Sequence, residues 1–376
     1  MFGPNRKIIG VIGLGIIGRA VSANLRQKGF QVFVWNRTPR PIPNFVGSPA
    51  ELAELCDFLQ IFVSDDEALL ETVERLSEKL GSRHIVIAHS TVAPDSMRAA
   101  AKIVERRGAR FVEAPFTGSK TAAETGELVY YVGGSDAALR DARPVLEASG
   151  KQIIKIGEIG QATAVKIATN MVTAASVQAA AEALALVRAL GLPFDRLLEA
   201  MQGNASYSTT LAMKVPKMIE HNFEPHFSVK HMLKDMEIAN QLGLSHYLEL
   251  GVTAAARDRL LEQMRWGHGD DDYSAVAREY LPDTRSTAQE ETQTAAPDVP
   301  GEAGSVAPAS ELTTSLAGLE EPRPTQENGD RATGDVAAPT SSSKELKEKT
   351  QLRRGFLSQL LRRGRQLLKQ PVSKEG

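Results

Sequence analysis

Two polar residues in one Ala-rich stretch are spaced so that they could act together. Lys166 and Asn170 stand four residues apart in a segment, 162–190, that carries small and apolar residues at helical spacing and no proline. Residues four apart lie on one face of a helix, so this ammonium group and this amide would point the same way. Since the apolar residues Val165 and Ile167 flank the lysine, its position beside them could reflect a catalytic role. An isolated lysine is more often solvated, and these residues alone leave both interpretations open.

A second candidate lies in the stretch EAPFTGSK, which follows a strand-like run at Arg110–Val112. Here Thr117, Gly118 and Ser119 could present consecutive backbone amides and hydroxyls to a carboxylate, as concave anion-binding turns do. The same residues could equally form an ordinary turn.

The third group is the glycine pattern Gly13-x-Gly15-x-x-Gly18, which follows the strand-like run Lys7–Ile12 and opens a helix-like segment. In that context the pattern indicates a dinucleotide-binding loop. The first glycine allows a tight turn, the second a close approach of a pyrophosphate, and the third close packing of helix on strand. The free amides of the helix N-terminus favour the phosphates. We therefore assign cofactor binding to Gly13, Leu14, Gly15, Ile16, Ile17 and Gly18.

The residues after the second strand-like run, Gln31–Trp35, indicate which cofactor is bound. A site that selects NAD places a carboxylate there for the ribose hydroxyls, whereas this chain has Asn36, Arg37 and Thr38. The guanidinium of Arg37 and the hydroxyl of Thr38 can bind a 2′-phosphate, and Arg40 could contribute. We expect NADP(H).

The elements that must position these groups alternate along the first part of the chain. This alternation predicts a Rossmann-type, doubly wound α/β sheet in residues 1–160. Further strands are expected at Phe58–Val63, His84–Ala88, Arg110–Val112, Leu128–Val132 and Gln152–Ile156. Helices are expected at Glu67–Leu80, Pro94–Arg107 and Asp136–Ser149. Ligands bind such sheets at the carboxyl ends of the strands, which adds Val63, Ser64 and Thr91 to the cofactor face.

After Gly191 the strand pattern stops, so residues 161–281 are predicted to form an all-α domain joined to the sheet by the long interdomain helix. Helices are expected at Pro193–Gln202, Thr210–Glu220, Val229–Leu242 and Ser245–Met264. On the third of these, Lys230 and Lys234 repel each other at four-residue spacing unless an anion lies between them, although a solvated basic face is the commoner explanation. No histidine or cysteine spacing suggests a metal site.

Together these motifs resemble the β-hydroxyacid dehydrogenase family. The resemblance rests on GLGIIG with NRT, STV at Ser90–Val92, EAPFTGSK, GxxGxAxxxKxxxN and KHxxKD, and covers residues 6 to about 280. EAPFTGSK and KHMLKDM are similar to the glyoxylate/succinic semialdehyde reductase branch. The resemblance implies that Lys166 is the catalytic lysine, that Asn170 with Thr117, Gly118 and Ser119 holds the substrate carboxylate, and that Thr91 and Lys234 contact the cofactor.

The chain departs from the family pattern at two of these positions. Thr117 stands where serine is usual, which keeps the hydroxyl but adds a methyl group to the pocket. Ala162 stands where glycine is usual, so the long helix is expected to pack slightly further from the cofactor domain.

The function implied by the resemblance is reduction of glyoxylate or succinic semialdehyde to the hydroxyacid, with hydride from NADPH and the proton from Lys166. A 3-hydroxyisobutyrate-type dehydrogenase that acts oxidatively stays open. So does a non-catalytic NADP-binding scaffold, a class that retention of Lys166 and Asn170 disfavours. Imine reductases also resemble the family but usually lack this lysine.

Composition sets the remaining expectations. The chain has 376 residues, a formal net charge of −2 and a single cysteine, Cys56, which favour a cytoplasmic protein without disulfides. No N-terminal targeting peptide and no uninterrupted apolar membrane span are evident. We expect a small oxoacid or hydroxyacid as partner, no metal and no nucleic acid. The long Ala-rich helix suggests a homodimer or homotetramer.

The C-terminal extension carries charge in two blocks of opposite sign. Residues 282–343 are acidic and rich in Pro, Ser, Thr and Ala, which is typical of a disordered linker. Residues 344–376 are basic, with Leu352, Phe356, Leu360 and Leu367 near one helical face. This pattern predicts an amphipathic helix that binds an anionic membrane surface or an acidic protein, or else a solubilising tail.

Overall fold

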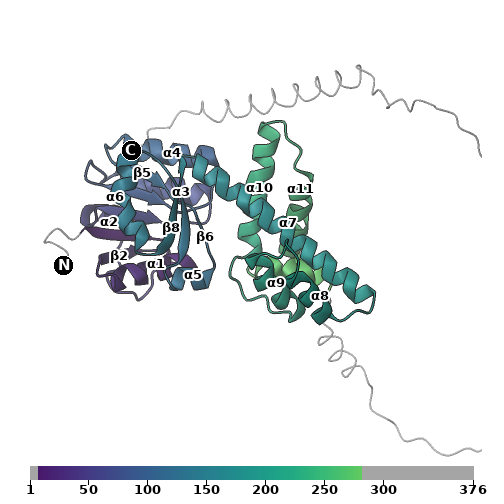
Figure 1. The fold of residues 1–376 in the computed structure, drawn as a ribbon. Helices are drawn as coiled ribbons and strands as arrows, with labels where there is room; N and C mark the ends of the chain where they lie inside the picture. Colours follow the sequence, from purple (N-terminus) through teal and green to yellow (C-terminus); the bar gives the residue numbers. More distant parts are fainter. Residues whose placement is uncertain (1–6, 282–376) are drawn as a thin grey trace, which may run out of the picture. The chain divides into compact units, whose positions relative to one another are not determined.

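The computed structural model describes residues 7–281 of the chain. The predicted acidic linker and basic tail lie outside the described residues and stay predictions. Figure 1 shows a sheet flanked by helices, followed by a part made of helices alone. The strands are β1 (Ile8–Ile12), β2 (Gln31–Trp35), β3 (Phe58–Ile61), β4 (Ile85–Ala88), β5 (Arg110–Glu113), β6 (Phe116–Thr117), β7 (Leu128–Gly133) and β8 (Gly150–Gly157).

The sheet has eight strands in the order β2-β1-β3-β4-β5-β7-β6, with β8 also paired to β7. The pairs from β2 to β5 are all parallel, while β7 runs antiparallel to β5 and β6. Strand β1 pairs with β2 on one side and with β3 on the other, so the order in which successive strands are added to the sheet reverses at β1. The loop after β1 therefore lies at the switch point where such sheets bind ligands.

Helices cover both faces of this sheet, because its central strands are mostly apolar; all four residues of β3 and of β4 are buried, and Gln60 is the polar residue among them. One core contains side chains of α1 (Ile16–Gln27), α5 (Lys120–Glu124) and α6 (Asp136–Glu147). The other contains side chains of α2 (Pro49–Leu55), α3 (Asp66–Ser77) and α4 (Pro94–Glu105). The predicted doubly wound α/β class is confirmed.

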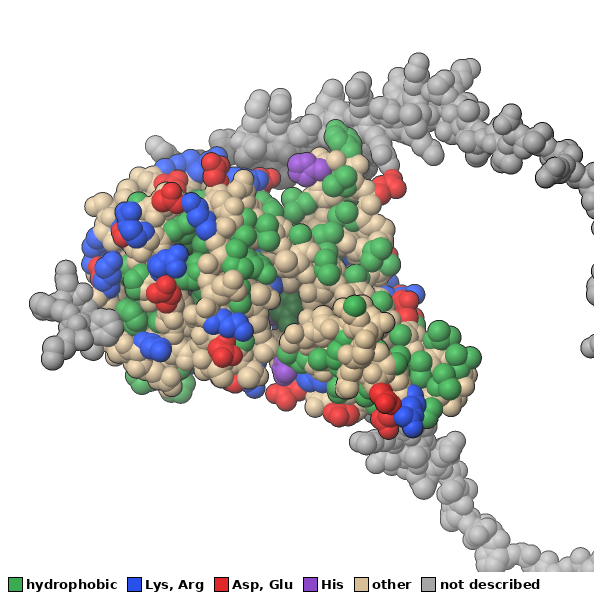
Figure 2. Space-filling view, viewed as in Figure 1, with side chains coloured by type: hydrophobic (Ala, Val, Ile, Leu, Met, Phe, Trp, Pro, Cys, Tyr) green, Lys and Arg blue, Asp and Glu red, His purple; other side chains and the backbone are tan. Residues whose placement is uncertain are grey.

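The second part is helical, as predicted. It contains α7 (Gln161–Ala189), α8 (Phe194–Gln202), α9 (Thr209–Ile219), α10 (Val229–Ser245), α11 (Gly251–Arg265) and the 3₁₀ helix η1 (Tyr273–Glu279). By length and composition α7 could cross a membrane. Its residues Val177, Ala181 and Leu184 are instead buried in a core shared with α9, α10 and α11. Figure 2 shows hydrophobic side chains also exposed on this helical part, and Leu244, Tyr247 and Val252 are among the exposed residues.

The expected helix start at Ser245 is wrong. Helix α10 continues to Ser245, and α11 begins only at Gly251. A Schellman-type turn ends α10: Tyr247 takes a left-handed φ of 60°, and the N–H of Leu248 donates to the carbonyl of Gly243 over 2.8 Å. The sequence gives little warning of this turn, because glycine and not tyrosine is the usual residue at its left-handed position.

Several short elements were not predicted, among them α2, β6, α5 and η1. A signal for α2 was present in Ser48-Pro49-Ala50-Glu51. The hydroxyl of Ser48 accepts from the N–H of Glu51 over 3.1 Å, and the Glu51 carboxylate accepts from the N–H of Gly47 over 2.7 Å. A serine cap followed by proline and a glutamate at the third position is typical of a helix N-terminus.

The N-terminus of α7 is capped from the sheet. The helix has no side-chain cap of its own and no acidic residue in its first turn. Glu113, at the end of β5, is fully buried, and its Oε1 accepts from the N–H of Ala162 over 2.8 Å. An anion at this position is favoured by the helix dipole. Ala162 is itself completely buried.

This contact gives a prediction for the pH dependence of stability. Burial raises the pKa of Glu113, and hydrogen bonds from Ala162 and neighbouring amides only partly oppose it. The folded protein therefore binds this proton more tightly than the unfolded chain does, so its contribution to stability is full at low pH. That contribution is lost as pH rises from the ordinary value of 4.5 through the raised one. In Glu113→Gln the side chain at this position cannot ionise, so this variant should lose less stability than wild type as the pH rises.

The measurement is the urea midpoint of unfolding at several pH values above 4.5 for wild type and Glu113→Gln. Glu147→Gln, which alters a glutamate 55% exposed, is the matched control and should follow wild type. Parallel pH curves for wild type and Glu113→Gln would contradict the prediction.

Candidate active site

A cavity of about 840 Å³ lies where loops after the strands meet the helical part. Most of the residues predicted from the sequence line it. They are Gly15, Ile16, Ile17, Gly18, Val63, Ser64, Thr91, Thr117, Gly118, Ser119, Lys166, Asn170 and Lys234. Gly13, Leu14, Asn36, Arg37 and Thr38 do not line it, although they belong to the loops after β1 and β2.

The three glycines of the loop after β1 have different reasons to be glycine. Gly13 has a φ of 90°, and a Cβ there would lie 2.0 Å from the carbonyl oxygen of Phe62. A Cβ on Gly18 would lie 2.0 Å from the carbonyl oxygen of Gly13. At Gly15 a Cβ would meet nothing within 4 Å. Two glycines thus serve backbone packing, and Gly15 faces open space in the cavity.

The N-terminus of α1 is suited to bind an anion. Gly15 caps it without any side-chain hydrogen bond, and the first turn contains no acidic residue. The free amides of such a turn and the helix dipole favour a phosphate. The residues present therefore fit the pyrophosphate of a dinucleotide beside Gly15.

The segment after β2 has one structural and two exposed residues. The Asn36 amide accepts from the N–H of Leu14 over 2.9 Å and donates to the carbonyl of Thr38 over 2.8 Å, so it joins the two loops. Arg37 and Thr38 are exposed. Within residues 7–281, no carboxylate lies within 4 Å of the Arg37 guanidinium, which leaves this cation available to a ligand.

Lys166 begins a chain of hydrogen bonds that crosses the site. Its Nζ donates to Oδ1 of Asn170 over 2.8 Å, and the Asn170 amide donates to Oδ2 of Asp235 over 2.6 Å. Asp235 is fully buried and also accepts from Lys234 Nζ over 2.8 Å. Lys234 in turn donates to the carbonyl oxygen of Thr91, in the loop after β4. The chain fixes both the amide of Asn170 and the direction of the Lys166 ammonium.

The surroundings of Lys166 lower its pKa to about 8. Burial is the main cause, because it disfavours the charged form; the positive charge of Lys234 acts in the same direction, and the negative charge of Asp235 opposes both. An ammonium group with a pKa near 8 can give up a proton close to neutral pH, as a general acid must.

The predicted carboxylate clamp lies on the same cavity. Gly118 has a φ of 139°, and a Cβ there would lie 2.8 Å from a methyl group of Leu128. Ser119 caps α5, accepting weakly from the N–H of Ala122 over 3.5 Å. The Thr117 hydroxyl makes no hydrogen bond to another of the described residues, so it is free for a ligand.

Two polar features of the cavity were not assigned from the sequence. Asp235 was visible in the KHMLKDM motif, but its burial beside Asn170 depends on the packing of α10 on α7. Lys214, on α9, lines the cavity and forms an ion pair with the fully buried Asp272. These partners are 58 residues apart, and no local spacing connects them.

His89 also lines the cavity but is a structural residue. It is buried, stacks on Phe62 at 4.3 Å, and its Nδ1 lies 2.8 Å from the carbonyl oxygen of Ala114. Burial lowers its pKa to about 3. Because this histidine stays neutral at ordinary pH values, it does not act as the general acid of the site.

Comparison with known proteins now assigns the chain. Residues 8–157 match the NAD binding domain of 6-phosphogluconate dehydrogenase. Residues 160–280 match the NAD-binding domain described for NADP-dependent 3-hydroxyisobutyrate dehydrogenase. Glyoxylate/succinic semialdehyde reductase 1 of Arabidopsis thaliana is 33% identical over 282 residues, which are 71% of this chain and 96% of that protein. The chain belongs to the β-hydroxyacid dehydrogenase family.

The chain is also similar to part of a longer protein and to a solved structure. The cytokine-like nuclear factor N-PAC of Gallus gallus is 32% identical over 74% of the chain, which spans about half (52%) of that longer protein. The structure of Mycobacterium tuberculosis 3-hydroxyisobutyrate dehydrogenase with L-serine matches with a TM-score of 0.66 and 27% identity. The match covers 73% of this chain and 99% of that one. The β-hydroxyacid dehydrogenases are oxidoreductases that act on CH–OH groups with a nicotinamide cofactor, and this chain is one of them.

The glycine geometry predicts opposite defects for two alanine variants. Gly15→Ala should fold normally, because its methyl meets nothing within 4 Å, but the methyl would enter the space for the pyrophosphate. We expect cofactor Kd to rise on the order of tenfold or more. Gly18→Ala should lose about 1–3 kcal/mol of stability through backbone overlap. Thermal unfolding and fluorescence titration with the reduced cofactor distinguish the two; equal stability losses would contradict the assignment.

Proposed function

We propose that the protein is an NADPH-dependent reductase of a short oxoacid such as glyoxylate or succinic semialdehyde. The observation that carries the proposal is the environment of Lys166, whose pKa is about 8 and whose cavity also contains the glycine loop and the Thr117 hydroxyl. The similarity to a glyoxylate/succinic semialdehyde reductase supports the substrate class.

In this proposal each group of residues has a separate role in the reduction of a carbonyl group. A bound nicotinamide cofactor supplies the hydride. The amides and hydroxyls of Thr117–Ser119, together with Asn170, hold the substrate carboxylate and so fix which face of the carbonyl is presented. The ammonium of Lys166 stabilises the negative charge that develops on the carbonyl oxygen and then gives its proton to that oxygen. Asn170, held by Asp235, keeps the ammonium in place.

The preference for NADPH rests on the segment after β2. Arg37 is exposed and has no carboxylate within 4 Å among residues 7–281, and the position offers no acidic group for a ribose 2′-hydroxyl. A 2′-phosphate would gain a charge-assisted hydrogen bond there.

The oxidative direction is the second candidate within the family. Residues 160–280 match the NAD-binding domain of NADP-dependent 3-hydroxyisobutyrate dehydrogenase, and the Mycobacterium tuberculosis relative is a 3-hydroxyisobutyrate dehydrogenase. Unprotonated Lys166 could accept the proton of a hydroxyacid in that direction, which would favour alkaline pH. The ratio of reduction and oxidation rates with each acid measures the preference.

A non-catalytic NADP-binding scaffold is the alternative of another class. The N-PAC relatives favour it, because they are described as nuclear factors and share 30–32% identity with this chain. The complete hydrogen-bond chain from Lys166 to Lys234 weighs against it. Absence of turnover with a panel of short oxoacids and hydroxyacids, alongside tight NADPH binding, would favour the scaffold.

The role of Lys166 is tested by Lys166→Met, which keeps the bulk of the side chain and removes its proton. Turnover should fall by a hundredfold or more, since general acid catalysis is typically worth about that much. NADPH Kd should change little. In wild type, kcat/KM for reduction should fall as pH rises through about 8, the pKa of Lys166. More than about a tenth of wild-type activity in Lys166→Met would exclude the lysine as the acid.

Cofactor choice is tested by Arg37→Asp, which removes a phosphate partner and introduces a carboxylate for the ribose. The ratio of kcat/KM with NADPH to that with NADH should fall by tenfold or more, since a charge-assisted hydrogen bond is worth about 1.5–3 kcal/mol. Arg40→Ala is the matched control. An unchanged ratio in Arg37→Asp with a reduced ratio in Arg40→Ala would move the phosphate site to Arg40.

A further inference from the structure

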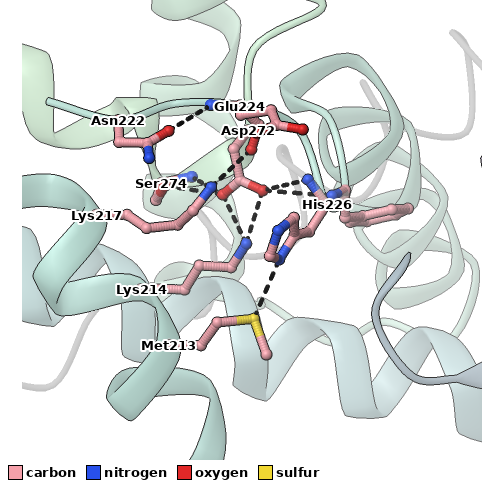
Figure 3. A network of polar contacts seen from close by, with 9 residues as sticks. Met213, Lys214, Lys217, Asn222, Glu224, His226, Asp272 and Ser274 are labelled. Carbon is pink, nitrogen blue, oxygen red and sulfur yellow. Dashed lines mark hydrogen bonds and ion pairs between the residues drawn. The ribbon is translucent and has the colours of Figure 1, made fainter. Parts of the chain in front are cut away.

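The ion pair between Lys214 and Asp272 is the centre of a buried network in the helical part (Figure 3). Lys214 Nζ lies 2.7 Å from both carboxylate oxygens of Asp272, and the two side chains are 4% and 0% exposed. Asp272 Oδ1 also accepts from the N–H and hydroxyl of Ser274, over 3.1 and 2.8 Å. Burial alone would raise the pKa of Asp272, but Lys214 and these donors lower it.

The network also ties down a segment of the cavity wall. Asp272 Oδ2 accepts from the backbone N–H groups of His226 and Phe227, over 2.9 and 3.3 Å. The segment 225–228, between α9 and α10, lines the cavity together with Met213 and Lys214 of α9. Within it, the ring of His226 contacts the sulfur of Met213 at 3.3 Å. The Asp272 carboxylate thus connects helix α9 to the 225–228 segment of the cavity wall.

The wall continues into α10, which carries Asp235. The N–H of Val229 donates to the carbonyl of Asp271 over 2.8 Å, and the N–H of Tyr273 donates to the carbonyl of Phe227 over 3.0 Å. The residues on both sides of Asp272 therefore hold the beginning of α10. Asp272 lies between these two pairing residues, and α10 also carries Asp235, which accepts the hydrogen bond from Asn170.

We propose that the Lys214–Asp272 ion pair positions the 225–228 wall against α9 and thereby determines which oxoacids longer than two carbons fit the cavity. The proposal rests on the proposed reduction of short oxoacids. The glycine loop and the Thr117–Ser119 clamp line the cavity together with Met213 and Lys214 of α9 and the 225–228 segment, so a longer substrate can contact this α9 and 225–228 side. Lys214 and Asp272 are positioning residues in this view.

The energetics of buried ion pairs support a role other than stability. Removing two charges from water is costly, and a buried pair can often be replaced by apolar residues of similar volume with no loss of stability. Helix α9 already buries Leu211, Val215 and Met218 in the helical core, so apolar packing of this element is available. A pair that instead bonds two backbone amides of a cavity wall fixes the position of that wall.

The first test variant is Lys214→Met, which leaves Asp272 with its four other donors from His226, Phe227 and Ser274. Because loss of one partner of a buried ion pair is destabilising, thermal unfolding of this variant is measured together with its kinetics. The second is Asp272→Asn, which weakens the hold on the wall directly. Asp141→Asn is the control: it removes the 2.5 Å ion pair with Arg110, which does not line the cavity. Each protein is assayed with glyoxylate and with succinic semialdehyde, and NADPH Kd is measured.

We expect KM for succinic semialdehyde to rise about tenfold in both cavity variants, the value of one lost hydrogen-bonding arrangement. The glyoxylate KM, kcat and NADPH Kd should stay within about threefold, and the control should match wild type. Hydrogen exchange of the His226 and Phe227 amides should accelerate in Asp272→Asn. Equal changes for both substrates, or no change for either, would overturn the proposal. If Asp272→Asn does not fold, Lys214→Met decides by the same criterion.

The outcomes separate this proposal from the proposed function. A wild-type protein that reduces neither acid refutes the proposed function, whatever the variants do. A wild type that reduces both, with an unchanged succinic semialdehyde KM in Lys214→Met, refutes only the positioning role. If wild type is inactive, unaltered exchange of the His226 and Phe227 amides in Asp272→Asn still overturns the hold of Asp272 on the wall.

Discussion

The partial burial of the Lys166 ammonium is the constraint on which the rest of the site depends. Taking a charge out of water costs several kcal/mol unless other groups compensate. Here compensation comes through the Asn170 amide, which is 2.8 Å from Lys166 and itself bonded to the buried Asp235. Since Lys234 neutralises Asp235 and reaches the Thr91 carbonyl, the helical part and the sheet are both needed to hold one lysine.

The N-terminus of the long helix α7 also has buried polar groups that need partners from the sheet. Its N-terminal amide at Ala162 is satisfied by Glu113 from the sheet, and its first turns then carry Lys166 and Asn170 into the cavity. Movement of α7 against the sheet would leave a buried carboxylate and a helix N-terminus without partners, which costs about 1–3 kcal/mol for each group. The position of the lysine is therefore tied to the contact that joins the two parts of the chain.

Local patterns account for what the sequence could predict. The glycine loop, the alternating strands and the helical spacing of Lys166 and Asn170 are all contained within a few turns of chain, so periodicity and turn chemistry suffice. The end of α10 was misplaced because Tyr247 takes a backbone conformation that sequence associates with glycine. The Lys214–Asp272 pair and the contact of Glu113 with Ala162 join residues 58 and 49 positions apart. Such pairs depend on tertiary packing, and no spacing rule identifies them.

The pairing of the lysines around the cavity distinguishes one from the others. Lys214, Lys230 and Lys234 each have a carboxylate oxygen within 2.8 Å, from Asp272, Asp270 and Asp235. Among residues 7–281, Lys166 is the cavity lysine whose hydrogen bond goes to a neutral amide oxygen instead. A carboxylate partner favours the charged lysine, as Asp272 does for Lys214 although burial lowers the pKa of that lysine, whereas an amide oxygen accepts the hydrogen bond without a full opposing charge. Lys166 thus fits the proposed role of a cation that attracts an anionic substrate and gives its proton to it.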